Sequence, residues 1–461
     1  MLRNRCCRWL ICVTAVVVLS GCATYYAKNI KLYRAIETGQ FETANKLLEK
    51  DDKSSKNRNQ LLHFLNRGYV SWMLNNHRQS VDFLNTAERI IDDHSMNLAA
   101  EALVLVTNPM MRPYRAEDFE IVMVNCIKAI NFMQLENYEA AMVECRRINL
   151  KLNQLNDKYP NHKNRYQRDA FAHTMMGLLY DANGDFNNAF IAYRNALDVY
   201  ENDYSQNFNI QPPQQLKLDI LRTAHTIGFR EELDFFERKF GMKYAPAQKP
   251  EAEMLFFWMN GFGPVKDEWS VNFTVVRGAG GLVTFVNEGE GFSFPFLLGS
   301  SSEGDAFSNL KLVRVAFPKY VERRPASVSA VINSRTASYS LEPVQDINAI
   351  AFKTLNDRFV REMAGSLLRV ATKQALEEIT RQKDRNAGSI LSILNAATER
   401  ADTRNWQSLP HGISYARIPL TGGNNQLTLN VRMRDGKTVS TDVSLQAQQG
   451  KTYFHAFHTL N

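Results

Sequence analysis

The 461-residue sequence predicts an α+β protein with two unlike halves. In the N-terminal half, apolar and small residues recur at helical spacing in a pattern that repeats, which is typical of a solenoid of helical hairpins. After about residue 250, apolar residues alternate in short runs separated by glycines, which predicts β-strands. We therefore expect an N-terminal α-helical solenoid followed by a small antiparallel β-domain that is interrupted by one long amphipathic helix.

The clearest hairpin spans residues 171–200. Its small residues Gly177, Ala189 and Ala196 are spaced by twelve and then seven positions, which lets two antiparallel helices approach closely. Between them, Gly184 can adopt the positive φ that ends the first helix, and Asp185 can cap the second. This pattern is typical of a tetratricopeptide repeat (TPR) hairpin, which buries its apolar face only by stacking on neighbours of the same kind.

Two other segments repeat this spacing, and a third repeats it weakly. Their intervals are uneven, which predicts an extra helix at residues 95–106 and a loop at residues 108–115. Helical periodicity at residues 214–240 predicts closing helices, so the TPR-like domain should span residues 22–245. The small positions are Gly68, Ser80 and Ala87 in one copy, Ala129, Ala141 and Ile148 in the next, and Leu32, Ala44 and Asp51 in the weak copy.

Residues 1–21 have the pattern of an export signal. Arginines precede an apolar run at residues 10–19, which is too short for a membrane-spanning helix. The residues Leu19-Ser20-Gly21-Cys22 resemble the lipobox of bacterial lipoproteins. The resemblance implies acylation of Cys22, with palmitate among its acyl groups, and Ala23 implies an outer-membrane address on the periplasmic face. The alternative is an uncleaved membrane anchor.

Processing at Cys22 would leave Cys126 and Cys145 as the remaining cysteines. They fall on the two helices of one predicted hairpin. An oxidising compartment permits a disulfide between them, and two separate buried thiols are equally consistent with the sequence.

The second predicted domain spans residues 251–461. A tight turn at Asp435-Gly436 joins two of its strands. Apolar residues spaced by four between residues 346 and 383 predict one long amphipathic helix. The sequence leaves the order of the strands open. Strands are expected at residues 254–259, 270–276, 282–286, 310–317, 427–433, 439–445 and 451–458, and a further hairpin at residues 327–341.

Three segments carry a wider resemblance. They are Tyr114-Arg115-Ala116-Glu117-Asp118-Phe119-Glu120, Asn260-Gly261-Phe262-Gly263-Pro264-Val265-Lys266 and Asp402-Thr403-Arg404-Asn405-Trp406. Together with the repeats at residues 136–141 and 183–186, they are similar to a family of bacterial TPR lipoproteins whose biochemical role is unassigned. The resemblance covers most of the mature chain. It implies a cell-envelope compartment and an architecture, but no catalytic residues.

No motif predicts catalysis, a cofactor or a metal site. The Gly-Lys-Thr runs at residues 436–438 and 450–452 lack the first glycine of a phosphate loop and are expected to be hairpin turns. His455 and His458 are three apart on a predicted strand, so they should point to opposite faces. The formal charge of +7 falls to about +4 without the signal segment, which does not indicate a nucleic-acid partner.

The register of TPR arrays assigns residues to the concave groove, and these residues are mostly apolar. An apolar groove of this size should be covered, either by a partner or by this chain's own helix at residues 346–383, and the internal helix is favoured. The groove positions are Leu62, Leu65, Tyr69, Trp72 and Met73 in one repeat, and Met123, Cys126, Ile130, Met133 and Gln134 in the next.

The leading functional hypothesis is a lipid-anchored, non-enzymatic envelope scaffold or adaptor that binds a protein partner of unknown identity through its repeats. The alternative is an envelope enzyme, or a protein that contacts peptidoglycan or another glycan, with its site in residues 251–461. A glycan site needs clustered exposed aromatic residues. The densest set is Phe256, Phe257, Trp258, Phe262 and Trp269, whose strand context favours a place in the core.

Overall fold

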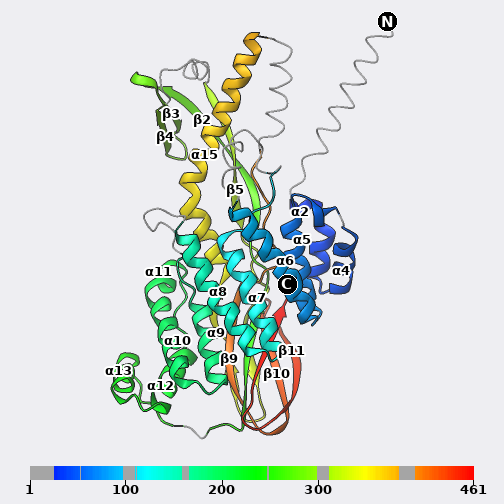
Figure 1. Ribbon diagram of the computed structural model, residues 1–461, viewed down its shortest axis with the longest axis vertical. Coiled ribbons are helices and arrows are strands. Elements are labelled where there is room, and N and C mark those ends of the chain that lie inside the picture. The colour runs from blue at the N-terminus through cyan, green and yellow to red at the C-terminus, as the bar shows by residue number, and fades with distance from the viewer. Residues whose placement is uncertain are drawn as a thin grey trace.

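The computed structural model describes residues 25–51, 53–96, 110, 112–157, 166–246, 249–297, 311–383 and 400–460. Helices form the N-terminal half, and three four-stranded sheets with one long helix form the C-terminal half (Figure 1). The protein is an α+β protein with a TPR-like helical region, as the sequence predicts.

The helices pair into antiparallel hairpins that stack along the chain. The pairs α5 with α6, α7 with α8, and α9 with α10 pack closely, and each hairpin contacts the next. The bounds are α2 (Tyr25–Lys28), α3 (Ile30–Glu37), α4 (Phe41–Lys50), η1 (Ser54–Lys56), α5 (Gln60–Met73), α6 (His77–Met96), α7 (Asp118–Gln134), α8 (Tyr138–Asn156), α9 (Ala170–Ala182), α10 (Phe186–Val199), the π-helical turn η4 (Tyr200–Tyr204), α11 (Ser205–Asn207), α12 (Gln214–Thr226) and α13 (Arg230–Phe240).

Small residues let the paired helices approach each other. A β-carbon at Gly68 would overlap the side chain of Leu84, and one at Gly177 would overlap the ring of Tyr193. The hydroxyl of Ser80 donates a hydrogen bond to the carbonyl of Gly68 across its hairpin, at 2.7 Å. These contacts follow the spacing of small residues in the sequence.

The turn between α9 and α10 has the expected chemistry. Gly184 has φ +75°, and the carboxylate of Asp185 accepts a hydrogen bond from the backbone N–H of Asn188 at 3.2 Å. Asn137 caps α8 in the same way by accepting from the N–H of Ala140.

The sheets are antiparallel except for one pair. Strands β1 and β12 run in parallel, with Leu255 opposite Phe454, so the last strand returns to lie beside the first. Strands β4, β8 and β9 are not among the strands that the sequence predicts. The strand orders are β12-β1-β9-β8, β11-β10-β6-β7 and β4-β3-β2-β5. The bounds are β1 (Ala252–Asn260), β2 (Val265–Arg277), β3 (Leu282–Asn287), β4 (Phe292–Leu297), β5 (Leu312–Val321), β6 (Ser327–Asn333), β7 (Ser338–Ser340), β8 (Glu342–Asp346), α15 (Ile347–Lys383), β9 (Gly412–Leu420), β10 (Gly423–Met433), β11 (Thr438–Ala447) and β12 (Thr452–Thr459).

Strand β1 is buried on both faces, and this creates three layers. Its side chains Leu255, Phe257 and Met259 belong to the core that contains the solenoid helices. The alternate side chains Met254, Phe256 and Trp258 pack against the sheet β11-β10-β6-β7. The order of layers is therefore solenoid, first sheet, second sheet, and one continuous core joins the two halves of the chain.

The third sheet and α15 form a projection that extends away from the solenoid (Figure 1). We call this unit the arm; it comprises β2, β3, β4, β5 and the part of α15 from Met363 onward. Met363, Leu367 and Val370 pack against the inner face of the sheet. The expectation that helix 346–383 covers the groove is thus wrong for most of its length. Only its first turns, through Ile347 and Ile350, join the core of the solenoid.

Several expectations lie outside the described residues. These are the signal segment 1–21, the lipidation site Cys22, and the inserted helix beyond Met96. Residues 108, 109 and 111 of the loop expected at residues 108–115 also lie outside. No helix among the described residues has both the length and the apolar composition needed to cross a membrane.

Candidate functional site

The groove residues predicted for partner binding are internal. Strand β12 and residues 404–409 fill the groove: the hydroxyl of Tyr69 lies 2.8 Å from Nδ1 of His458, and its ring meets Trp406 edge to face. The hydroxyl of Tyr138 donates to the carbonyl of Thr452 at 2.9 Å. The chain therefore occupies its own groove. Leu62, Leu65, Tyr69, Trp72, Met123, Cys126, Ile130 and Met133 are buried, and Met73 and Gln134 are partly buried.

His458 is held as a neutral imidazole. Its Nε2 lies 2.6 Å from the carbonyl of Gly261, so Nε2 carries the proton while Nδ1 accepts from Tyr69. Burial lowers the pKa of His458 to about 4. His455 lies against Phe256 rather than beside His458, and burial lowers its pKa too. Among the described residues, no group of three or more His, Cys, Asp or Glu side chains is placed to hold a metal ion.

Cys126 and Cys145 are both free and fully buried. Of the two alternatives, the structure therefore has two separate thiols rather than a disulfide. Burial, with the nearby charge of Asp169 adding to it at both sites, raises the pKa of each thiol. Both thiols are thus protonated, which makes them poor nucleophiles.

The three segments that carry the family resemblance meet at one buried cluster. The carboxylate of Glu117 forms ion pairs with Lys266 and with Arg358 of α15. The backbone N–H of Lys266 donates to Asn405, whose amide donates to the carbonyl of Pro264. Segments more than a hundred residues apart in sequence are therefore joined here. We call Glu117, Glu120, Lys266, Arg358 and Asn405 the motif cluster.

Glu120 completes the cluster from the first turn of α7. Its carboxyl accepts hydrogen bonds from the backbone N–H of Trp406 at 2.6 Å and from that of Glu117 at 3.0 Å, and it also contacts the hydroxyl of Tyr114. Glu117 and Glu120 together form a capping box at the start of α7. The side chain of Glu120 thus caps the N-terminus of α7 and also holds residues 402–406 against the solenoid.

The two glutamates of the cluster titrate in opposite directions. Burial alone would raise the pKa of Glu117, but the charges of Arg358 and Lys266 lower it to about 2. Burial and the neighbouring Glu117 charge raise the pKa of Glu120 to about 7. The cluster therefore contains one permanent carboxylate and one carboxyl that titrates near neutral pH.

Arg404 anchors the third segment from the other side. Its guanidinium forms an ion pair with Asp402 at 2.6 Å and donates to the carbonyl of Arg58 at 3.2 Å. It also lies 5.5 Å from the ring centre of Tyr114, a cation–π contact. The contacts explain why a charged side chain is buried in this part of the core.

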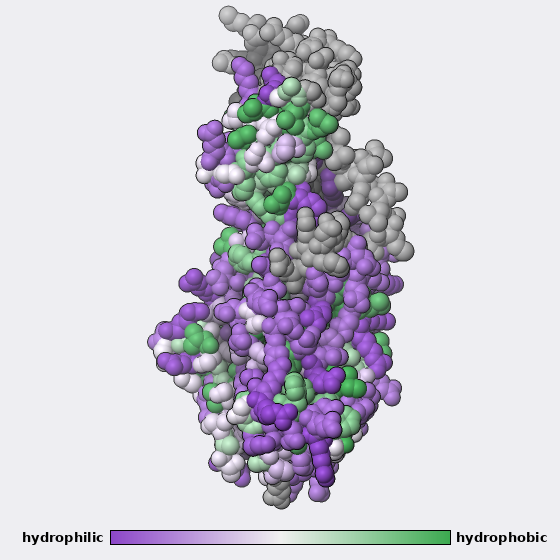
Figure 2. Space-filling view, turned by 90° about the vertical axis from the view of Figure 1, so that its left-hand side faces the viewer, coloured by the Kyte–Doolittle hydropathy of each residue, from purple (hydrophilic) through white to green (hydrophobic). Residues whose placement is uncertain are grey.

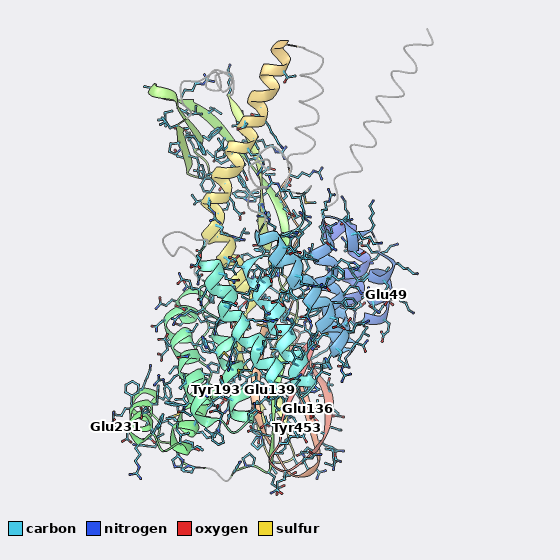
Figure 3. All side chains as sticks on the ribbon, viewed as in Figure 1. Glu49, Glu136, Glu139, Tyr193, Glu231 and Tyr453 are labelled. Atoms are coloured by element: carbon cyan, nitrogen blue, oxygen red, sulfur yellow. The ribbon has the colours of Figure 1, made fainter. Side chains whose placement is uncertain are left out.

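A second buried ion cluster fastens the first sheet to the solenoid. Arg417 of β9 forms ion pairs with Asp181 at 2.7 Å, Asp219 at 3.1 Å and Glu253 at 2.7 Å. Tyr193 of α10 is labelled in Figure 3, and Arg417 donates to its hydroxyl at 3.2 Å. Carboxylates from two helices and one strand thus surround the guanidinium of Arg417, and Arg222 of α12 also pairs with Asp181 and with Asp219.

A more exposed contact joins the α7–α8 turn to the start of β12. The ammonium of Lys451 lies 2.7 Å from the carboxylate of Glu136 and 5.0 Å from the ring centre of Tyr453. Figure 3 labels Glu136 and Tyr453 on the two sides of this contact. Such an exposed pair contributes little to stability.

A cleft of about 480 Å³ lies beside the motif cluster, between α11, β5 and the first turns of α15. Tyr320 links the two features: it lines the cleft, and its ring centre lies 5.6 Å from Nζ of Lys266. The rings of Trp269 and Phe359 stack at 6.0 Å inside it. Its lining residues are Asn207, Trp269, Pro318, Lys319, Tyr320, Ala349, Phe352, Lys353, Leu355, Asn356 and Phe359.

The aromatic set considered for a glycan site is mostly core. Phe256, Phe257, Trp258 and Phe262 are buried in the packing of the first sheet. Only Trp269 is partly exposed, and it lines the cleft. These five aromatic residues therefore do not form an exposed surface to which a glycan could bind.

The basic residues of the motif cluster and of the Arg417 cluster were not predicted from the sequence as ion-pair partners. Glu117, Glu120 and Lys266 lay in segments of interest without an assigned role, and Arg358 had no distinguishing signal on its amphipathic helix. Arg417 did have a distinguishing signal in the sequence. It follows Ile413 and Tyr415 at alternate positions of a strand, and a charged residue on such an apolar face indicates a buried ion pair.

No family model and no curated protein matches this chain. Similar solved structures include the apo form of RapI, at 14% identity and a TM-score of 0.34 over 47% of this chain and 52% of RapI. MamA matches at 15% identity and a TM-score of 0.29 over 47% of this chain and 92% of MamA. A Podosopora anserina kinesin light chain with nearly identical TPR-like repeats matches at 13% identity and a TM-score of 0.31, over 46% and 90%.

This chain spans about half the length of RapI. The identities and TM-scores of these matches are too low to indicate a function. The TPR-like character of the helical region rests on its own hairpins.

Proposed function

We propose that this protein is a lipid-anchored, non-enzymatic adaptor of the bacterial cell envelope. Cys22 carries the lipid at the periplasmic face of the outer membrane, and the arm binds a protein partner. The observation that carries the proposal is that the groove is already occupied, whereas an apolar face of the arm is exposed. The groove, where a TPR array binds its ligand, is filled by β12 and residues 404–409, while the arm keeps an apolar face exposed.

The exposed face is the side of the arm sheet that points away from α15. Leu297 is 77% exposed, Leu312 is 58% exposed and Val276 is 49% exposed. The strand register places Leu282 opposite Leu297, which extends the same patch. Figure 2 shows apolar residues gathered over this upper part of the molecule. Exposed apolar patches on otherwise polar surfaces are typical of protein interaction sites.

A photo-crosslinking residue placed at Leu297 or Leu312 tests the partner surface in intact cells. We expect a discrete protein adduct from both positions, identified by mass spectrometry. The matched control is Leu150 of α8, which is 55% exposed but lies on the solenoid. The same adducts from Leu150, or none from the arm, would refute a partner site on the arm.

Substitution Cys22→Ser tests the anchor separately, because it removes the proposed lipid acceptor. We expect the variant to lose fatty-acid labelling and to leave the outer-membrane fraction, while its folded part keeps the wild-type melting temperature. Continued labelling of the variant would contradict lipidation at Cys22.

The peptidoglycan alternative lacks a specific observation in its favour. Its aromatic residues are buried, apart from Trp269 in the cleft. The charge and the aromatic residues of the cleft lining determine whether it binds a glycan or a peptide.

A further inference from the structure

We propose that the cleft between α11, β5 and α15 is a binding site for a short acidic peptide segment of a protein partner, one that pairs an apolar anchor side chain with a nearby carboxylate. The cleft is separate from the exposed face of the arm sheet. The two sites can therefore be tested independently.

The size and lining of the cleft fit a ligand with an apolar part. Its volume of about 480 Å³ is within the range of small-ligand pockets. Trp269, Phe352, Leu355 and Phe359 supply an apolar wall, and Phe352 is 38% exposed although it is a large aromatic residue. Aromatic residues in such a setting are typical anchors for a partner's side chain.

The charge of the cleft selects an anionic ligand. Of the described residues, Lys319 and Lys353 line it and no Asp or Glu does. In the part of the chain that the structure describes, neither lysine forms an ion pair. Asp267 lies opposite Lys319 in the strand register but forms no ion pair with it, so both ammonium groups are available to a carboxylate that lies close to an apolar group.

The geometry of the rings favours a peptide over a sugar. A sugar stacks on an open aromatic face, but Trp269 and Phe359 stack on each other at 6.0 Å, and Tyr320 packs against Phe352 at 5.8 Å. Trp269 and Phe359 therefore each have one face covered by the other ring. Asn356 is exposed on its rim, where an amide can pair with a peptide backbone.

The test is to pan a random twelve-residue phage-displayed peptide library against the full mature chain and to titrate the enriched peptides by fluorescence anisotropy. We expect peptides with Asp or Glu within a few positions of Phe, Leu or Trp. The double variant Lys319→Glu, Lys353→Glu should weaken their binding at least tenfold, and Phe352→Ala should also weaken it, with the melting temperature unchanged.

A charge swap makes the test specific. Peptides whose acidic residues are replaced by lysine should bind the Lys319→Glu, Lys353→Glu variant better than the wild type. The matched control is Lys46→Glu, Lys50→Glu on α4, a reversal of the same size on exposed solenoid residues, which should leave binding unchanged.

Three outcomes would overturn the proposal. They are the enrichment of no peptide, the enrichment of peptides without acidic residues, and equal binding to the wild type and the Lys319→Glu, Lys353→Glu variant. Soluble peptidoglycan fragments that bind through Trp269 with no effect of the lysine reversal would instead indicate a glycan site. None of these results bears on the exposed outer face of the arm sheet, whose crosslinking is measured separately.

Discussion

Glu120 is the residue whose ionisation most affects the joint between the solenoid and the C-terminal half. It is fully buried, and the neighbouring Glu117 keeps its negative charge because of Lys266 and Arg358. A second negative charge here is costly, so the pKa of Glu120 rises to about 7. In an unfolded chain the same carboxyl would titrate near its ordinary value of 4.5.

The sign of the resulting pH dependence follows from linkage. Between pH 4.5 and 7 the unfolded state loses the Glu120 proton while the folded state keeps it, so the contribution of this group to stability falls as the pH rises. Glu120→Gln stays neutral at every pH. Relative to this variant, the wild type should therefore lose roughly 3 kcal/mol of unfolding free energy across this range.

Urea denaturation at steps between pH 4.5 and 7.5 measures this difference. Glu139→Gln, at an exposed position of α8, is the control and should follow the wild-type profile. Parallel profiles for wild type and Glu120→Gln would show that Glu120 ionises normally.

At the scale of elements, charge pairs from separate parts of the chain hold β9 against the solenoid. Arg417 faces carboxylates from α9, α12 and β1. Removal of the Arg417 charge would leave Arg222 alone to compensate Asp181 and Asp219, and would take away the ion-pair partner of Glu253, all in a poorly solvated site.

Arg417→Met keeps much of the side-chain volume but removes the charge. We expect it to lower the unfolding free energy by about 3 to 5 kcal/mol. Arg432→Met, at an exposed position of β10, should cost less than about 0.5 kcal/mol. Similar midpoints for the two variants in chemical denaturation would mean that the Arg417 cluster adds little to stability.

At the scale of the whole molecule, the solenoid and the first sheet form one folding unit. One core cluster runs from Leu62 and Met133 of the solenoid to Phe257 and Phe454 of the sheet. The solenoid alone would expose its apolar groove to water, at a cost of about 25 cal/mol per Å² of apolar surface.

A fragment of residues 23–245 should therefore expose the apolar groove and be unstable as a soluble monomer. We expect it to bind a hydrophobic dye such as 8-anilinonaphthalene-1-sulfonate and to aggregate, whereas the full mature chain should do neither. A soluble, monomeric fragment without dye binding would show that the solenoid folds independently of the sheet.

The sequence by itself determined the secondary structure of much of this protein. The small residues Gly68 and Gly177 marked helical hairpins, and alternating residues marked strands such as β10 and β11, because these patterns reflect contacts between neighbours in sequence. It also predicted that the groove is apolar and must be covered.

Only the tertiary structure decided what covers the groove, which charges meet, and that Cys126 and Cys145 remain thiols. His458 fills the groove beside Tyr69 from 389 positions away, and Arg358 reaches Glu117 across 241 positions. Local periodicity shows that a residue is buried, but not which distant segment buries it. That choice depends on the parallel pairing of β12 with β1, which no turn or local pattern specifies.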